Sequence, residues 1–148
     1  MTLRARARQV FDIGIYVIVV AVVVQFFLAG LGIFVSAELF FWHTTVNAIV
    51  IGIGPLLLAL VGWYAGVDRR TLLMTASMFG LVVLQSLLLF PYHMAAEGPI
   101  RAVAALHAVN AVFIFWVALR LLDRVRYPRG LAHTIPPTPA RGAVEGRV

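Results

Sequence analysis

Residues 106–119, LHAVNAVFIFWVAL, form an apolar run that two polar side chains interrupt, His107 and Asn110. A spacing of three residues places these side chains on the same face of a helix. The apolar run extends from about residue 100 to residue 122, and a helix needs about 20 such residues to cross a bilayer. The stretch therefore predicts a membrane-spanning helix with one polar face.

The composition of the whole chain also indicates a membrane protein. Of its 148 residues, 62% are hydrophobic and 12% are charged, whereas soluble domains are about half apolar and about a quarter charged. Three further apolar runs cover residues 10–35, 37–66 and 71–92. We therefore expect an all-α integral membrane protein, with residues 1–126 forming an up-down-up-down four-helix bundle in the lipid bilayer.

The positions of the arginines predict the orientation of this bundle. Arginine supplies all twelve basic residues; eleven fall on one side of the predicted spans and only Arg101 on the other. Because cytoplasmic loops carry the excess of basic residues, we expect a multi-pass protein of the cell inner (plasma) membrane with both termini in the cytoplasm. This placement beside apolar runs argues against a nucleic-acid partner. Residues 127–148 are basic and proline-rich, which predicts a disordered cytoplasmic tail.

Several kinds of chemistry are excluded by missing residues. The chain has no cysteine, which rules out disulfides, thiolate-ligated iron–sulfur clusters and covalent c-type haem. It also has no Ser-His-Asp set, phosphate-binding glycine loop or close pair of carboxylates, so no catalytic residue is predicted. Asp12, the acid nearest a span, is expected to pair with Arg8 or to lie at the membrane interface.

The four apolar segments resemble two copies of one helical hairpin. Gln25 in VVVQFFLAGL of the first segment matches Gln85 in VVLQSLLLF of the third. His43 in HTTVNA of the second segment matches His107 in HAVNA of the fourth, if one residue is treated as an insertion. Since the polar residues align as well as the apolar ones, we predict that the bundle is built from two helical-hairpin repeats.

The two matched histidines are the strongest candidates for chemistry. Both are expected ~10 Å below the outer end of their helices, from the rise of an α-helix. The second and fourth helices would be diagonal in the bundle, with axes on the order of 11–14 Å apart. Two imidazoles facing across that gap could ligate one haem iron, and bis-histidine coordination suits electron transfer. We therefore predict a haem b cofactor with His43 and His107 as its metal ligands.

Four amide side chains accompany the histidines and complete the predicted cofactor site. They share positions on the polar faces of the four helices: Gln25, Asn47, Gln85 and Asn110. A ligating histidine usually donates its second ring N–H to an acceptor, and these amides could accept it. Alternatively, they form hydrogen bonds between helices, which is the interpretation we favour.

Arg101 is a further candidate for contact with the cofactor. It precedes His107 by six residues, a rise of ~9 Å, so its guanidinium could reach haem propionates. An ion pair with Glu97 or Glu38 is the alternative. A porphyrin would also need small side chains on the first and third helices. Those available are Gly30, Gly32, Ala76, Ser77 and Gly80.

The combination of these motifs resembles one four-helix half of haem A synthase, in which histidines of the second and fourth helices ligate one haem. The closest local stretch is LQSLLL…ALHAVNAVFIF. The chain has only one bundle, and its second helix lacks the acidic residue that serves oxidation of the haem methyl group. The resemblance therefore implies haem binding rather than haem modification. Residues 8–123 also resemble small uncharacterised four-helix membrane proteins of actinobacteria, on QFFLAGLGIF…H and LHAVNAVFIF.

Two other classes of function remain open at this point. The short loops and glycine-containing helices also suit a cofactor-free accessory or structural subunit of a larger membrane complex. A quinone-binding or small-molecule transport protein is the other alternative. Under the leading hypothesis, the expected partner is a larger membrane redox complex or a quinone.

Overall fold

The computed structural model describes residues 1–94 and 97–127, and every regular element within them is helical. Four stretches are long and apolar enough to cross a membrane: Leu3–Phe34, Ala37–Ala65, Arg69–His93 and Gly98–Arg126. The predicted all-helical class is therefore confirmed, as is the presence of four helices long and apolar enough to cross a membrane. Of the predicted tail, all but Tyr127 lies outside the described residues.

The first hairpin joins one long helix to a second that changes its type along its length. Its elements are α1 (Leu3–Phe34), η1 (Ala37–Leu39), α2 (Phe40–Val46), η2 (Asn47–Ile53) and α3 (Gly54–Ala65). Helix α1 starts earlier than predicted, because the side chain of Thr2 accepts a hydrogen bond from the Ala5 N–H and caps the helix. At the other end, Gly66 adopts the left-handed conformation (φ 79°) that ends α3.

Segment η2 is a π-helix, in which the N–H groups reach carbonyls five residues back; the N–H of Gly54 bonds to the carbonyl of Ile49. Pro55 follows immediately and has no N–H. In a regular α-helix its ring would press against the carbonyl of Ile51, four residues earlier. The wider π turn, with Gly52 nearby, is a local solution to this conflict.

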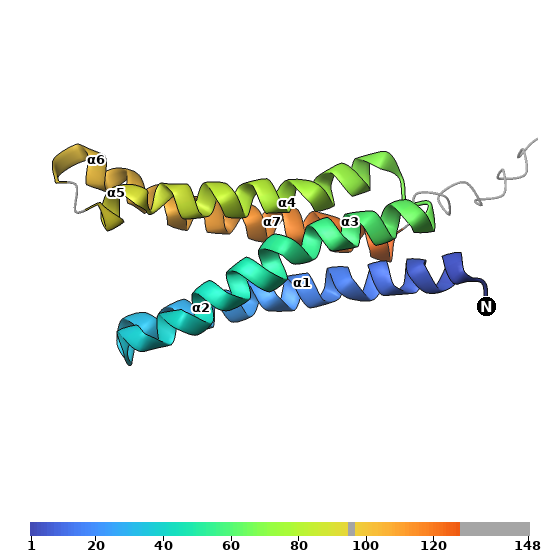
Figure 1. Ribbon diagram of the computed structural model, residues 1–148, viewed down its shortest axis with the longest axis horizontal. Coiled ribbons are helices and arrows are strands. Elements are labelled where there is room, and N and C mark those ends of the chain that lie inside the picture. The colour runs from blue at the N-terminus through green and yellow to red at the C-terminus, as the bar shows by residue number, and fades with distance from the viewer. Residues whose placement is uncertain (95–96, 128–148) are drawn as a thin grey trace, which may run out of the picture.

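The second hairpin begins where Asp68 caps α4 by accepting a hydrogen bond from the Thr71 N–H. Its elements are α4 (Arg69–Leu88), α5 (Phe90–His93), α6 (Gly98–Ala102), η3 (Val103–Ala105) and α7 (Leu106–Arg126). The N-terminus and the end of α7 lie at the same end of the molecule, which we call the inner end (Figure 1). The opposite end is the outer end.

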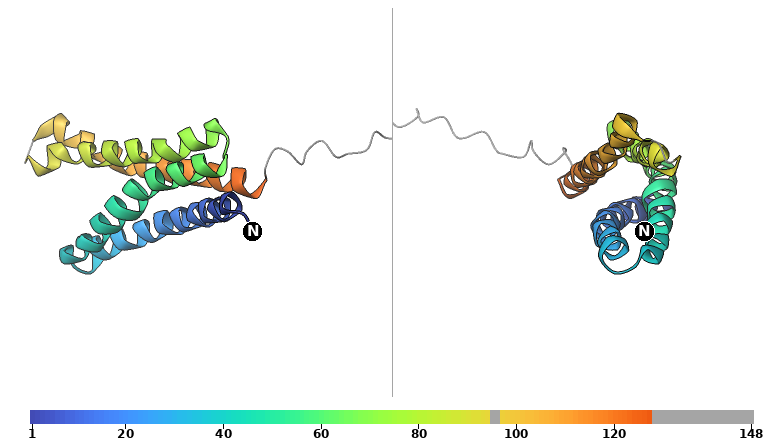
Figure 2. Two further views of the ribbon diagram at one scale, coloured as in Figure 1. Left: turned by 45° about the vertical axis from the view of Figure 1, so that its right-hand side comes forward. Right: turned by 90° about the vertical axis from the view of Figure 1, so that its left-hand side faces the viewer.

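The helices pack as a ring of four neighbours. Helix α1 packs against α3 and α7, and α4 packs against the same two helices. Helices α3 and α7 therefore lie diagonally across the bundle, as the end-on view in Figure 2 shows. His107 is on α7 itself, and His43 is on α2, which continues through η2 into α3.

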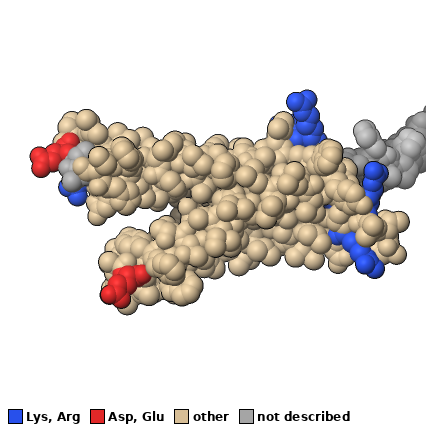
Figure 3. Space-filling view, in the orientation of Figure 1, with Lys and Arg blue, Asp and Glu red and all other residues tan. Residues whose placement is uncertain are grey.

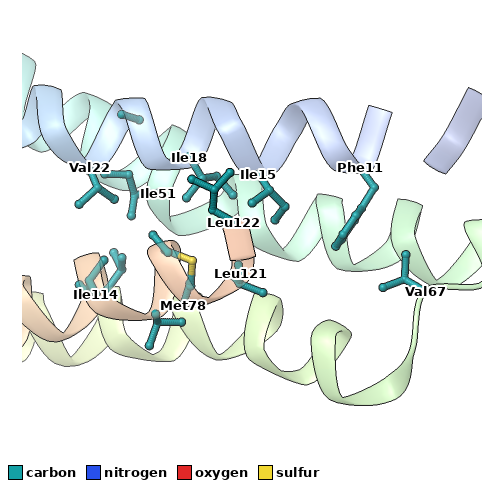
Figure 4. Close-up of a cluster of buried hydrophobic side chains, with 14 residues drawn as sticks. Phe11, Ile15, Ile18, Val22, Ile51, Val67, Met78, Ile114, Leu121 and Leu122 are labelled. Carbon is teal, nitrogen blue, oxygen red and sulfur yellow. The ribbon is translucent and has the colours of Figure 1, made fainter. Parts of the chain in front are cut away.

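The packed hydrophobic core occupies the inner half of the bundle (Figure 4). On α1 it runs from Phe11 to Val22, and on α7 from Ile114 to Leu122, with Met78 of α4 between them. Close helix contact depends on Gly62 of α3, because a Cβ atom there would lie 2.7 Å from the ring of Phe11. The inner half is thus the tightly packed part of the molecule.

The two hairpins separate toward the outer end. We call residues 23–50 the first outer arm and residues 83–113 the second outer arm. Within the first arm α2 packs against α1, and within the second α5 packs against α4 and α6. Large apolar side chains on both arms are exposed, including Phe27, Trp42, Leu87 and Val109. Figure 3 shows an open notch between the arms.

Charged side chains gather at the two ends of the molecule (Figure 3). Glu38 and Glu97 are exposed at the outer end, whereas the inner end carries most of the arginines. Arg8 and Asp12 form an ion pair of 2.9 Å there, which confirms the pairing expected for that acid. The belt between the ends is apolar, as a membrane-spanning protein requires.

Candidate site between the outer arms

The first hairpin ties His43 to Gln25 through two reciprocal contacts. The Nδ1 atom of His43 lies 3.2 Å from the backbone oxygen of Gln25, and the Nε2 of Gln25 donates to the backbone oxygen of His43 at 2.8 Å. Each residue therefore fixes the other, and α2 is held against α1 at this level.

The second hairpin repeats the histidine contact. The Nδ1 atom of His107 lies 2.9 Å from the backbone oxygen of Gln85. Since a carbonyl oxygen can only accept, the proton of each neutral imidazole resides on Nδ1, and Nε2 keeps its lone pair. A histidine that ligates a metal through Nε2 needs this tautomer, with Nδ1–H donated to an acceptor.

The two imidazoles occupy corresponding positions in the two outer arms, each beside the glutamine of its hairpin. Their side chains are half-buried, each against the backbone of the glutamine on the neighbouring helix of its own hairpin. The structure thus gives His43 and His107, which lie 64 positions apart in the sequence, the same contact in the two hairpins. Their contacts place them at matching depths.

A buried layer of amides lies just inward of the histidines. Asn110 donates through Nδ2 to the Oε1 of Gln85 at 2.6 Å and to the backbone oxygen of Leu81 at 2.9 Å. Gln25 is also buried, but its Oε1 has no hydrogen-bond partner among the described residues. Asn47 is half-buried. In each hairpin, therefore, one amide side chain donates to the neighbouring helix (Gln25 in the first, Asn110 in the second), and a backbone oxygen contacts the histidine.

Below the amides lies a layer of four aliphatic side chains, one from each membrane-spanning stretch. These are the buried residues Val22, Ile51, Val82 and Ile114, each three or four positions from an amide of the layer above. This aliphatic layer separates the polar site from the rest of the core. The site therefore opens toward the notch and is closed toward the inner half.

The π-helix absorbs the inserted residue that distinguishes the two repeats. Four positions separate His43 from Asn47, whereas three separate His107 from Asn110. Segment η2 begins at Asn47, and a π turn holds one more residue than an α turn. The register is restored by Ile51, which is buried as Ile114 is. The sequence signals for η2 are the one-residue gap between the repeats and Pro55.

The donor set fits a haem better than a bare metal ion. Among residues 1–94 and 97–127, no three His, Asp or Glu side chains are grouped so that they could hold a metal ion. Two imidazoles alone suit an iron whose other four ligands come from a porphyrin. The orientation of both Nδ1 atoms toward backbone oxygens is consistent with that role.

The expected small residues make room only in part. A Cβ atom at Gly30 would meet nothing within 4 Å, so space is open there, but one at Gly32 would lie 2.7 Å from the ring of Phe40. Ser77 and Gly80 are exposed on the outside of α4. The prediction that Gly32, Ser77 and Gly80 provide space was wrong, because Gly32 accommodates Phe40 and the other two face away from the bundle.

Arg101 lies outside the histidine pair. It is exposed on α6 at the outer end, with its guanidinium 5.5 Å from the centre of the Tyr92 ring. The ion pairs found in the described part of the chain join other residues, Arg8 with Asp12 and Arg124 with Asp68. Instead of the expected pairing with Glu97 or Glu38, Arg101 therefore makes a cation–π contact with Tyr92.

Together these features define a four-helix protein whose helices are apolar enough to cross a membrane. Each of its two hairpins contains the same contact between a histidine ring and a glutamine backbone oxygen. Residues 25–95, slightly less than half of the chain, match a family of unknown function (DUF6220). The match covers Gln25, His43, Asn47 and Gln85 but stops before His107. No curated protein and no solved structure matches the chain. The comparisons therefore agree with similarity to an uncharacterised family and give no support to similarity with haem A synthase.

Proposed function

We propose that this protein binds one b-type haem between His43 and His107 within the membrane. The observation that carries the proposal is the matched contact of both Nδ1 atoms with backbone oxygens of Gln25 and Gln85. It leaves both Nε2 atoms available as ligands. When bound, the haem would supply one-electron redox chemistry, serving electron transfer or a larger redox complex, with a quinone as a possible electron partner.

The surrounding residues would have supporting roles. The amide layer of Gln25, Asn47, Gln85 and Asn110 would form the polar floor of the site. Arg101 is the arginine of the second outer arm and is exposed at the outer end, where its guanidinium would be available to haem propionates. The aliphatic layer would keep water from the inner half of the bundle.

We also propose that the inner end faces the cytoplasm and that the protein spans the plasma membrane. The basis is the concentration of arginines at this end, since such residues favour the cytoplasmic side. The notch and the histidines would then lie near the opposite face of the membrane. An electron partner would approach from that face or from within the bilayer.

The direct experiment is haem titration of the detergent-purified full chain, followed by absorption spectroscopy. The unmodified chain should bind one equivalent and give a six-coordinate low-spin spectrum. His43→Ala and His107→Ala should each abolish that spectrum. His93→Ala is the matched control, because this histidine is exposed at the end of α5, and it should bind haem as the unmodified chain does. The proposal would be contradicted if the unmodified chain bound no haem. It would also be contradicted if both His43→Ala and His107→Ala kept the six-coordinate spectrum.

The separated arms also favour a second candidate function. The exposed apolar side chains that line them could instead contact a helix of a larger membrane complex, with no cofactor. In that case the unmodified chain and both histidine variants would have the same absorption spectrum, with no bound haem. Substitutions of the exposed apolar side chains on the arms would prevent co-purification of partner subunits.

A further inference from the structure

The two histidine sites are not equivalent, although the two hairpins that carry them match in sequence and fold. The Nδ1 contact is 2.9 Å long at His107 and 3.2 Å long at His43. Below His107, Asn110 satisfies Gln85. Below His43, the Oε1 of Gln25 is buried and without a partner in the described residues.

The cause of this difference is the inserted residue in the first hairpin. In the second hairpin the amide three positions after the histidine reaches the glutamine. In the first hairpin that position is Val46, and Asn47 falls one residue later, at the start of η2. Residues of an α-helix turn by about 100° per position. Asn47 is therefore rotated away from the place that Asn110 occupies.

In its present register the first hairpin satisfies His43 and the Nε2 of Gln25, which donates to the His43 oxygen at 2.8 Å, but it leaves the Oε1 of Gln25 unpaired. A slip of one residue along α1 would bring Asn47 to the Oε1 of Gln25. It would also put Thr44 where His43 now contacts the Gln25 carbonyl. The adjacent π-helix already holds one residue more than an α turn, so it is where a one-residue displacement of α2 could be absorbed. The second hairpin has no comparable alternative, since both contacts form at once.

We infer that the two histidines are unequal ligands: His107 is the fixed member of the pair, and His43 is the exchangeable one, so that a small exogenous ligand enters on the His43 side. This inference rests on the proposed haem binding. The second hairpin holds its histidine above a satisfied amide pair, whereas the first holds its histidine above a buried oxygen that only a competing register would satisfy.

Hydrogen–deuterium exchange of the full chain in detergent, without added haem, tests the inequality itself. Amides of residues 43–53 should exchange at least about tenfold faster than those of residues 107–117, because the less satisfied segment opens at lower free energy. Equal protection of the two segments would overturn the inference. This measurement does not depend on haem, so its outcome is separate from that of the proposed function.

Carbon monoxide binding to the reduced, haem-loaded protein tests the direction of the inequality. His43→Ala should keep haem and bind carbon monoxide about tenfold more tightly, since no internal ligand then competes. His107→Ala should lose haem affinity by about 100-fold, at the upper end of the range for disrupted metal sites. The opposite pattern, or equal losses, would overturn the inference while leaving haem binding intact. Failure of the unmodified chain to bind haem would instead contradict the proposed function.

Removal of the insertion provides the complementary variant. Deletion of Thr45 gives HTVNA, which has the spacing of HAVNA in the second hairpin. Asn47 should then reach Gln25 while His43 keeps its contact. Exchange in the first hairpin should slow by about tenfold, and carbon monoxide affinity should fall. Unchanged exchange in a folded deletion variant would contradict the proposed cause.

Discussion

Asn110 donates a 2.6 Å hydrogen bond to the Oε1 of Gln85, which joins α7 to α4 directly below His107. The corresponding oxygen of Gln25 in the first hairpin has no partner among the described residues. One inserted residue between His43 and Asn47 accounts for the difference. The π-helix that follows absorbs this insertion and also relieves the conflict at Pro55. A single change in spacing thus separates two otherwise matching hairpins.

Substitution of Asn110 should destabilise the protein more than substitution of Asn47. Asn110→Ala removes two hydrogen bonds and leaves the Gln85 oxygen buried and unpaired, which costs about 1–3 kcal/mol. Asn47→Ala removes no side-chain hydrogen bond of the described structure and should cost under about 0.5 kcal/mol. Equilibrium unfolding in mixed micelles would measure both. Equal effects would show that the amide pair below His107 contributes little.

Close packing of the inner half should make Gly62 intolerant of a methyl group. In Gly62→Ala the new Cβ would lie 2.7 Å from the Phe11 ring and 2.9 Å from Leu72. Such overpacking typically costs about 1–3 kcal/mol.

Gly80→Ala is the matched control, because a Cβ there would meet nothing within 4 Å. Alanine also has the higher helix propensity, by about 1 kcal/mol, so this variant should be as stable as the unmodified chain or more so. Thermal unfolding of the two variants in the same detergent would compare them. Similar losses in both would contradict the packing described here.

The cap of α4 should make stability depend on acidic pH. Thr71 donates to both oxygens of Asp68, and this hydrogen bonding, aided by Arg124, lowers the pKa of Asp68 from its ordinary value of 3.8. The stabilisation should be complete above pH 3.8 and should disappear as the pH falls through the lower folded-state pKa.

Asp68→Ala should cost about 0.5–2 kcal/mol at neutral pH, the range found for lost N-caps. Below the folded-state pKa of Asp68 the unmodified chain and the variant should converge. Denaturant unfolding of both proteins across pH 2–7 would follow this difference. A difference that stayed constant with pH would contradict an ionised cap.

Orientation can be measured cleanly because the chain contains no cysteine. Glu97→Cys introduces a thiol at the outer end and Arg70→Cys introduces one at the inner end; both positions are exposed. With the inner end in the cytoplasm, a membrane-impermeant maleimide should label intact cells through residue 97 only. Labelling through residue 70 alone would reverse the proposed orientation.

The sequence was sufficient to predict four helices long and apolar enough to cross a membrane, because apolar length alone determines them. It also predicted the pairing of Arg8 with Asp12, since the two residues lie one helical turn apart. The separation of the outer arms could not be predicted. In a helix that is apolar on all sides, hydrophobicity does not distinguish a face that contacts lipid from one that contacts protein.

Within the site, the sequence indicated which residues correspond but not how they contact one another. The matching of His43 with His107 followed from the repeat. The backbone oxygens of Gln25 and Gln85 have no sequence signature, so their contacts with the histidines could only be found in the structure. Likewise, the gap in the alignment did not reveal whether a loop, a bulge or a π turn would absorb it, because that choice depends on Pro55 and on packing against α4.

The absorption spectrum of the protein purified in detergent from haem-replete cells tests the central claim most directly. The account predicts a Soret band and sharp α and β bands on reduction, with one b-type haem per chain, and the loss of this spectrum in His107→Ala. A colourless protein that also fails to take up added haem would contradict it.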